Sequence, residues 1–288
     1  GPETLAAAAN VFVGHTEAPL VVRPYLAKMT RSELNAMMTG GFATVTGGLL
    51  GAYAGMGIDI AHLLTASVIS APAALLIAKV MQPETEEQAA SATLVRPWQS
   101  SSEDREDEPV NLIAAAVTGA TEGLKLALNV GAVLIAFLAL IRLVDVLLGL
   151  GCQAYASFFD VAIPQLTLGV ILGYACWPIA WLLGIPSGEC LEAGRLIGLK
   201  TVANEFIAYQ SLGDIMKEKE PAISERTATI LTYALAGFSN FGAIGIQVGG
   251  IGGLEESRRG DLAQLGLRAM FGGLLACCMT GAVAGLLL

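Results

Sequence analysis

Charged residues are scarce in this sequence, at 14% of 288 residues, while hydrophobic residues make up 54% and the mean hydropathy is +0.64. Soluble domains contain about 25% charged residues, so this composition excludes an ordinary soluble protein and indicates a membrane protein. Histidine occurs only twice, and the five cysteines have no CxxC spacing, so neither a metal site nor a disulfide framework is indicated. The net charge is −9 without a basic cluster, which argues against a nucleic-acid partner.

Catalytic patterns are also missing. The sequence contains no Ser-His-Asp, HExxH, P-loop or GxGxxG pattern, so we expect neither an enzyme nor a bound cofactor. It has no signal peptide and begins Gly-Pro-Glu without a methionine, and we expect a polypeptide whose beginning is absent.

What the sequence does contain is a polar tip between two short apolar arms. An apolar helical pattern over residues 5–13 ends at Gly14, the polar residues 15–17 (His-Thr-Glu) follow, and an apolar stretch resumes at residue 18. Each arm has about ten residues, whereas a membrane-spanning helix needs roughly 20. The pattern therefore predicts a re-entrant hairpin, and a carboxylate at its tip is a candidate functional site.

The same order of elements occurs twice along the chain. The first hairpin is followed by a helix over residues 32–56 with a predicted break at 44–48, and then by a span over 62–81. A second hairpin has its tip at 203–206, with Glu205 between two short arms. It is followed by a helix from Ser224 interrupted at 239–242 and by a span over 262–288. Repeats with paired broken helices indicate the midplane site of a secondary transporter.

The segments between the two repeats differ from them. Residues 82–109 form an acidic, serine-containing aqueous loop. An amphipathic start at 111–125 leads into a predicted span over 126–148, then a loop over 153–165 and an interfacial helix over 167–183. The predicted organisation is an all-α polytopic membrane protein with an inverted repeat of re-entrant hairpin, broken helix and full span. Its domains are residues 1–81 (first repeat), 82–109 (loop), 110–166 (amphipathic helix and scaffold span) and 167–288 (interfacial helix and second repeat).

Several of these segments together resemble the concentrative nucleoside transporters, and their sequences are more similar to the animal branch of the family. The resembling stretches cover nearly the whole chain and comprise Gly-His-Thr-Glu-Ala-Pro-Leu (14–20), Val-Arg-Pro-Tyr-Leu (22–26), Thr-Ala-Ser-Val (65–68), Ser-Ala-Pro-Ala (70–73), Asn-Glu-Phe-Ile-Ala-Tyr (204–209) and Thr-Tyr-Ala-Leu-Ala-Gly-Phe-Ser-Asn (232–240). The resemblance begins at the first hairpin, so we expect the family's earlier scaffold helices to be absent from the sequence considered.

The resemblance implies a homotrimeric, multi-pass plasma-membrane symporter that imports a nucleoside together with Na⁺, or with H⁺ in some members, by an elevator-like movement. It also implies roles for particular residues: base contacts from His15, Thr16 and Glu17, an apolar wall from Leu49, ribose contacts from Glu205 and Asn240, and a Na⁺ site from Asn10, Val13, Thr44 and Val45.

Two features of the predicted site concern selectivity. His15 replaces the family's usual glutamine, which adds a titratable group with one donor and one acceptor when neutral. In the family, bulkier hydroxyl residues at the positions of Gly14 and Gly48 accompany pyrimidine selectivity, so two glycines favour acceptance of purines as well. Leu49 is a large residue of the apolar wall and disfavours acceptance of purines.

Two alternatives remain open on the sequence alone. One is a transporter of the same architecture for another small polar solute, although the tips carry carboxylates and no arginine for an anionic substrate. The other is a non-transporting sensor or truncated homologue that keeps the binding residues.

Overall fold

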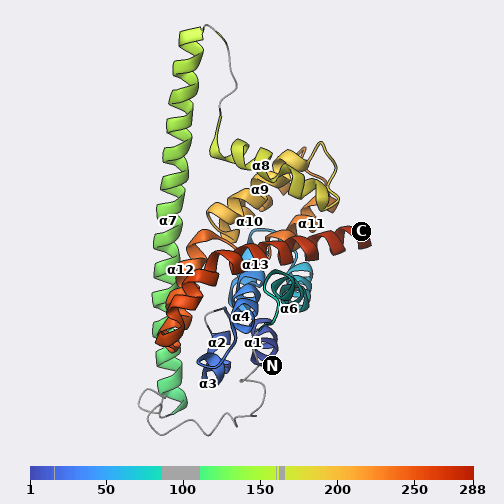
Figure 1. Cartoon of the computed structure of the whole chain (residues 1–288). Coiled ribbons are helices and arrows are strands. Elements are labelled where there is room, and N and C mark those ends of the chain that lie inside the picture. The colour runs from blue at the N-terminus through green and yellow to red at the C-terminus, as the bar shows by residue number, and fades with distance from the viewer. Residues whose placement is uncertain (16, 86–110, 160, 162–165) are drawn as a thin grey trace. The chain divides into compact units, whose positions relative to one another are not determined.

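A computed structural model of the chain describes residues 1–15, 17–85, 111–159, 161 and 166–288, and the regular structure in these residues is entirely helical (Figure 1). The all-α prediction is thus confirmed. The helices are α1 (Pro2–Asn10), α2 (Ala18–Val21), α3 (Arg23–Leu26), α4 (Arg31–Ala43), α5 (Gly47–Gly55), α6 (Ile60–Met81), α7 (Leu112–Phe159), α8 (Leu168–Leu182), α9 (Cys190–Val202), α10 (Glu205–Met216), α11 (Glu225–Leu235), α12 (Phe241–Leu254), the short 3₁₀ helix η3 (Glu256–Arg258) and α13 (Arg259–Leu287).

The chain forms two compact units. One contains residues 1–93 and 169–288, and therefore both predicted repeats, whereas the other contains residues 94–168 with α7. Among the described residues, three helical stretches are long and apolar enough to cross a membrane, at Ile60–Met81, Leu138–Phe159 and Glu256–Leu287. These lengths fit a multi-pass membrane protein.

Local capping explains where the helices of the two repeats begin. The predicted capping box opens α4, because Thr30 Oγ1 accepts a bond of 3.1 Å from the N–H of Glu33, while the Glu33 carboxylate accepts one of 3.0 Å from the N–H of Thr30. The side chains of Asn204, Ser224 and Asn240 cap α10, α11 and α12 in the same manner. Every helix that follows a hairpin tip or a break in the second repeat thus has its own start signal.

Both predicted broken helices are interrupted. The gap between α4 and α5 lies at residues 44–46, and the gap between α11 and α12 lies at 236–240, starting three residues before the predicted interruption at 239–242. The helices α1 and α9, predicted as the first arms of the hairpins, end at Asn10 and Val202, so α1 ends three residues before the predicted Val13.

The middle of the chain differs from its prediction. Residues 112–159 form one uninterrupted helix, instead of an amphipathic helix, a separate span and a loop beginning at residue 153. Residues 152–159 contain no proline and no glycine, and their aromatic residues and alanines are compatible with helix, so nothing ends α7 there. The predicted acidic loop lies outside the described residues from position 86 to 109.

The helix α13 is the centre of the unit that holds both repeats. It packs against α4, α6, α11 and α12, and this packing depends on glycines on its surface. At Gly273, for example, a Cβ atom would collide with the Cβ of Phe42 and would lie 2.8 Å from its carbonyl carbon. Without side chains at such positions, α13 approaches the backbone of the broken helix α4 directly.

The two breaks meet beside α13. A Cβ atom at Gly237, in the second break, would lie 2.6 Å from the carbonyl oxygen of Phe42, at the end of α4, and 2.7 Å from Cys277 Sγ on α13. The Cys277 thiol also donates to the carbonyls of Ala43 and Ala236, one from each break, at 3.5 and 3.1 Å. The ends of the two broken helices are therefore adjacent.

We expect Gly237→Ala to destabilise the protein. The new methyl group would collide with the Phe42 carbonyl and the Cys277 thiol, and overpacking of this kind costs about 1–3 kcal/mol. The melting temperature in detergent should fall by roughly 2–10 °C. Gly245→Ala is the matched control on α12, since a Cβ there meets no atom within 4 Å and its melting temperature should stay unchanged or rise. Equal melting temperatures for both variants would contradict the close approach.

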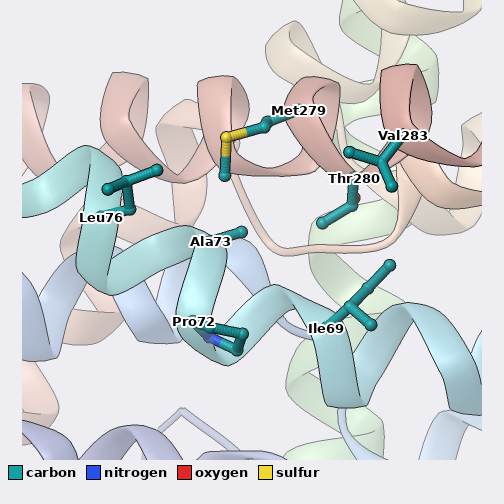
Figure 2. Close-up of a pocket in the computed structure, with 7 residues that line it drawn as sticks. All are labelled: Ile69, Pro72, Ala73, Leu76, Met279, Thr280 and Val283. Carbon is teal, nitrogen blue, oxygen red and sulfur yellow. The ribbon is translucent and has the colours of Figure 1, made fainter.

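A groove of about 270 Å³ lies between α6 and α13 (Figure 2). Apolar side chains line most of it, and Pro72 lies within α6 at this point. The residues that line it are Ile69, Pro72, Ala73, Leu76, Met279, Thr280 and Val283. It contains none of the predicted site residues, and its apolar character differs from that expected of a nucleoside site.

Candidate functional site

The tip of the first hairpin is held against the first break. At the end of α1, Asn10 Nδ2 donates to Thr44 Oγ1, which follows the last residue of α4, at 2.6 Å. Ser67 Oγ on α6 donates to the carbonyl oxygen of Val11 at 3.0 Å. One buried hydrogen bond thus joins the end of the hairpin arm to the start of the break, and a partly buried one joins it to α6, at the place where helix ends leave backbone groups unpaired.

Two of the four predicted ion ligands lie together here. The side chains of Asn10 and Thr44 are both buried, at 2% and 3% exposure. Asn10 Oδ1 accepts no hydrogen bond within the described part of the chain, although it is completely enclosed. Val45 is buried, whereas the side chain of Val13 is 39% exposed, so Val13 could contribute only its carbonyl oxygen.

The ligand types available here suit a monovalent cation. They are amide, hydroxyl and carbonyl oxygens without a carboxylate, and the described residues contain no cluster of three or more His, Cys, Asp or Glu side chains that could hold a metal. Neutral oxygens at helix breaks are the usual surroundings of Na⁺ in transporters with broken helices.

The predicted base contacts lie at the tip itself. The His15 ring is 4.6 Å from that of Phe238 in the second break, with an interplanar angle of 43°. Both ring nitrogens of His15 are buried without a hydrogen-bond partner among the described residues, so its donor and acceptor are available to a ligand. Glu17 is exposed, contrary to the expectation of a buried tip carboxylate, and Thr16 lies outside the described residues.

The two glycines of the predicted selectivity region have different surroundings. A Cβ atom at Gly48 would meet nothing within 4 Å, so this position on α5 has free space. At Gly14, a Cβ atom would collide with the Glu17 carboxylate and lie 3.0 Å from Thr46 Cγ2. The extra room predicted beside Gly14 is therefore filled by Glu17 in this state. Leu49 is partly buried and packs on the core cluster that includes Tyr53.

The second hairpin presents a buried carboxylate to the first repeat. Glu205 is the first residue of α10 and is 3% exposed, and its Oε1 accepts a bond of 3.2 Å from the hydroxyl of Tyr53 on α5. Its Oε2 is enclosed and accepts no bond from any described residue. Asn240 is buried at the start of α12, where its Oδ1 accepts the N–H of Ala243 at 2.8 Å and its amide N–H₂ group remains for another partner.

Each tip thus reaches the opposite repeat. The first tip contacts the second break through His15 and Phe238, and the second tip contacts α5 through Glu205 and Tyr53. The structure therefore places oxygen and nitrogen atoms from both halves near one another, as a polar solute with several hydrogen-bonding groups requires.

Three further polar residues of this region were not predicted. Tyr53 resembles a core aromatic in the sequence, and only the three-dimensional contact with Glu205 indicates its role. Lys200 is fully buried near the second tip, and Gln247 is 1% exposed with an unpartnered Oε1, within the described residues, facing Gly41. For these two a sequence signal existed, because each is a polar residue within a largely apolar or glycine-rich helix.

Comparison with known proteins agrees with this geometry. Residues 62–285 match the family model described as the C-terminus of Na⁺-dependent nucleoside transporters. The uncharacterized transporter YutK of Bacillus subtilis is 46% identical over 99% of this chain and 66% of its own length. Human solute carrier family 28 member 3 is 42% identical over 99% of this chain and 41% of its own length, and rat sodium/nucleoside cotransporter 1 is 40% identical over 99% and 44%.

The chain therefore spans about two thirds or less of the length of these relatives. The expected likeness to animal members is present, but YutK and a transporter of Haemophilus influenzae, at 46% and 44% identity, are more similar than the animal proteins named above.

Solved structures give the same result. CNTnw in an inward-facing, substrate-bound state superposes with a TM-score of 0.86 at 42% identity, over 99% of this chain and 64% of that one. An intermediate state of CNTnw gives a TM-score of 0.89 at 42% identity, over 99% and 65%. The match of residues 62–285 to the family model, together with these relatives, shows that the chain belongs to the concentrative, Na⁺-dependent nucleoside transporter family, whose members are transporters and not enzymes.

Proposed function

We propose that the protein is a secondary active symporter that imports nucleosides together with Na⁺. The observations that support this most are the contact of each hairpin tip with the opposite repeat and the close approach of the two breaks, with Glu205, Asn240 and His15 each offering unpaired or partly paired polar groups. A nucleoside has a ribose with hydroxyl donors for a carboxylate and a base whose edge pairs with an imidazole. Two relatives named as sodium/nucleoside cotransporters support the same substrate and ion.

The cation enters this proposal through the first repeat. Asn10 and Thr44 lie where α1 ends and α4 breaks, so an ion bound there would fix the tip that carries His15 and Glu17. Ion binding would thus prepare the base side of the nucleoside site, which is a physical basis for coupling.

Elevator-type movement and a trimeric state belong to the same proposal. Both hairpins and both broken helices lie in one compact unit, and α7 lies in another, which supports a moving body separate from a scaffold. In this proposal α7 supplies the trimer contacts in the plasma membrane.

Uptake by proteoliposomes tests the proposed function. Radiolabelled uridine and adenosine should accumulate when an inward Na⁺ gradient is imposed, and replacement of Na⁺ by choline at fixed pH should abolish accumulation. Accumulation that is independent of Na⁺ would refute the coupling. Absence of nucleoside binding and uptake, with accumulation of another polar solute, would refute the substrate class.

We expect a broad range of nucleosides. The free space at Gly48 leaves room beside the base. Inosine and adenosine should therefore inhibit uridine uptake as strongly as cytidine does. Gly48→Ser should reduce competition by the two purine nucleosides more than by cytidine, because its side chain narrows that space. Gly51→Ser is the matched control one turn later on α5, where a Cβ also meets nothing within 4 Å. A wild-type protein that accepts only pyrimidines would contradict the size argument.

The histidine at the tip should make base recognition depend on pH. Neutral His15 offers one donor and one acceptor, and its protonated form offers donors only, so a base edge that needs an acceptor should bind less well as the pH falls. The affinities of uridine, cytidine and inosine at two pH values measure this effect. His15→Gln keeps a donor and an acceptor at every pH and should remove the selective change. The same pH response in wild type and His15→Gln would show that another group is responsible.

A further inference from the structure

Lys200 is a fully buried basic residue that has no role in the proposed transport site. It lies in the last turn of α9, the first arm of hairpin 2, with 0% exposure. Its Nζ donates to the carbonyl oxygen of Ala234 at 3.0 Å. A buried ammonium group is costly unless it has partners, and an ionisable residue in a membrane-embedded region is usually functional.

The acceptor of this bond belongs to the end of a broken helix. α11 ends at Leu235, so the carbonyl of Ala234 is one of the last four that have no partner within the helix. This end of the helix carries the negative part of the helix dipole, which favours a positive charge. Tyr209 donates its hydroxyl to the neighbouring carbonyl of Thr232 at 2.7 Å, so hairpin 2 supplies two donors to the same helix end.

The first repeat has a neutral counterpart of this contact. There, Asn10 in the last turn of α1 donates to Thr44 at the break that ends α4, and Asn10 Oδ1 is left enclosed without a partner. In both repeats, a side chain from the end of the first hairpin arm contacts the end of the helix that precedes the break, at Thr44 directly after α4 and at Ala234 in the last turn of α11. It precedes the tip carboxylate by a few residues, Asn10 before Glu17 and Lys200 before Glu205. The first repeat offers oxygens there, and the second offers an amine.

We propose that the Lys200 ammonium group is a tethered cation, which occupies in the second repeat the position that the coupling cation takes in the first. This inference rests on the proposed function for its comparison with Na⁺. The ammonium group holds hairpin 2 against α11 without an added ion, and it lies on the same hairpin as the buried Glu205 carboxylate, which its positive charge favours. Lys200 is thus a positioning residue for Glu205.

Removal of the amine and its chemical replacement test this proposal. Lys200→Ala should weaken uridine binding roughly tenfold or more, because the end of α11 loses its buried donor and Glu205 loses a positive charge on its own hairpin. Ethylammonium or propylammonium should restore uridine binding, with an effect that saturates as the amine concentration rises, because either can place an ammonium group in the vacated space. Tetramethylammonium is bulkier and has no N–H donor, so it should not restore binding. Lys200→Arg should retain part of the affinity, and the Na⁺ concentration for half-maximal binding should stay unchanged in Lys200→Arg.

Arg195→Ala is the matched control. Arg195 lies on the same helix but is partly exposed and paired with Glu192, so its loss should leave uridine binding and the response to amines unchanged. If Lys200→Ala is too unstable for binding measurements, ethylammonium must raise its melting temperature selectively over that of Arg195→Ala, and tetramethylammonium must not.

The outcomes separate this proposal from the proposed function. Normal uridine binding by Lys200→Ala, or a folded variant that no alkylammonium ion restores, would overturn the tethered cation while leaving the nucleoside symporter intact. A wild-type protein that binds no nucleoside would refute the proposed function. In that case the melting-temperature experiment still decides the role of Lys200: selective stabilisation by ethylammonium supports it, and lack of stabilisation refutes it.

Discussion

Glu205→Gln is expected to abolish nucleoside uptake and to weaken uridine binding about 10- to 100-fold, because hydrogen bonds to a charged acceptor are worth about 1.5–3 kcal/mol. The glutamine has the same shape, so the variant should fold and reach the membrane. What it loses is the charge on an enclosed carboxylate whose Oε2 has no partner among the described residues and is therefore available to a ribose hydroxyl. Glu17→Gln should also impair uptake, although Glu17 is exposed in this state.

Two further variants make the Glu205 experiment specific. Tyr53→Phe removes the 3.2 Å bond to Glu205 Oε1 and should reduce affinity less than Glu205→Gln, because the charge remains. Glu189→Gln is the control at the base of the same hairpin, where the carboxylate accepts two bonds of 3.0 Å from Ser224, and it should transport normally. Near-normal uptake by Glu205→Gln at normal surface expression would remove Glu205 from the site.

Asn10→Ala should raise the Na⁺ concentration that gives half-maximal uptake by about tenfold or more, since it removes both a candidate ligand oxygen and the 2.6 Å bond that joins α1 to the first break. Uridine affinity at saturating Na⁺ should change less. The measurement is uridine uptake as a function of Na⁺ concentration, with ionic strength held constant by choline.

Thr44 provides the matched pair for this prediction. Thr44→Val removes the hydroxyl that accepts from Asn10 and should act like Asn10→Ala, whereas Thr44→Ser keeps the hydroxyl and should behave nearly as the wild type. An unchanged Na⁺ dependence in both Asn10→Ala and Thr44→Val would place the ion elsewhere.

Local signals in the sequence predict the starts of α4 and α11, but not the end of α1 at Asn10 or the start of the second break at residue 236. Thr30 with Glu33, Ser224 and Asn240 are capping residues that act within three positions of themselves, so their effect is readable without the fold. The break after Ala43 is also predictable from neighbouring residues, because β-branched residues are followed there by glycines. By contrast, the end of α7 was placed too early, because no local residue type ends that helix before Phe159.

Contacts between the repeats could not be predicted in this way. The bond between Tyr53 and Glu205 joins residues 152 positions apart, and the contact between His15 and Phe238 joins the first repeat to the second. Such properties follow from packing, whereas the sequence reports only the types of residue available.

One nucleoside is expected to contact both hairpin tips and both breaks. The most direct test is a structure of the protein with 5-iodouridine and Na⁺, in which anomalous scattering locates the iodine on the base. The iodine is expected beside His15 and Leu49, with the ribose within hydrogen-bonding distance of Glu205 and Asn240. A nucleoside bound at another place, such as the groove between α6 and α13, with the two tips empty, would contradict a site shared by the two repeats.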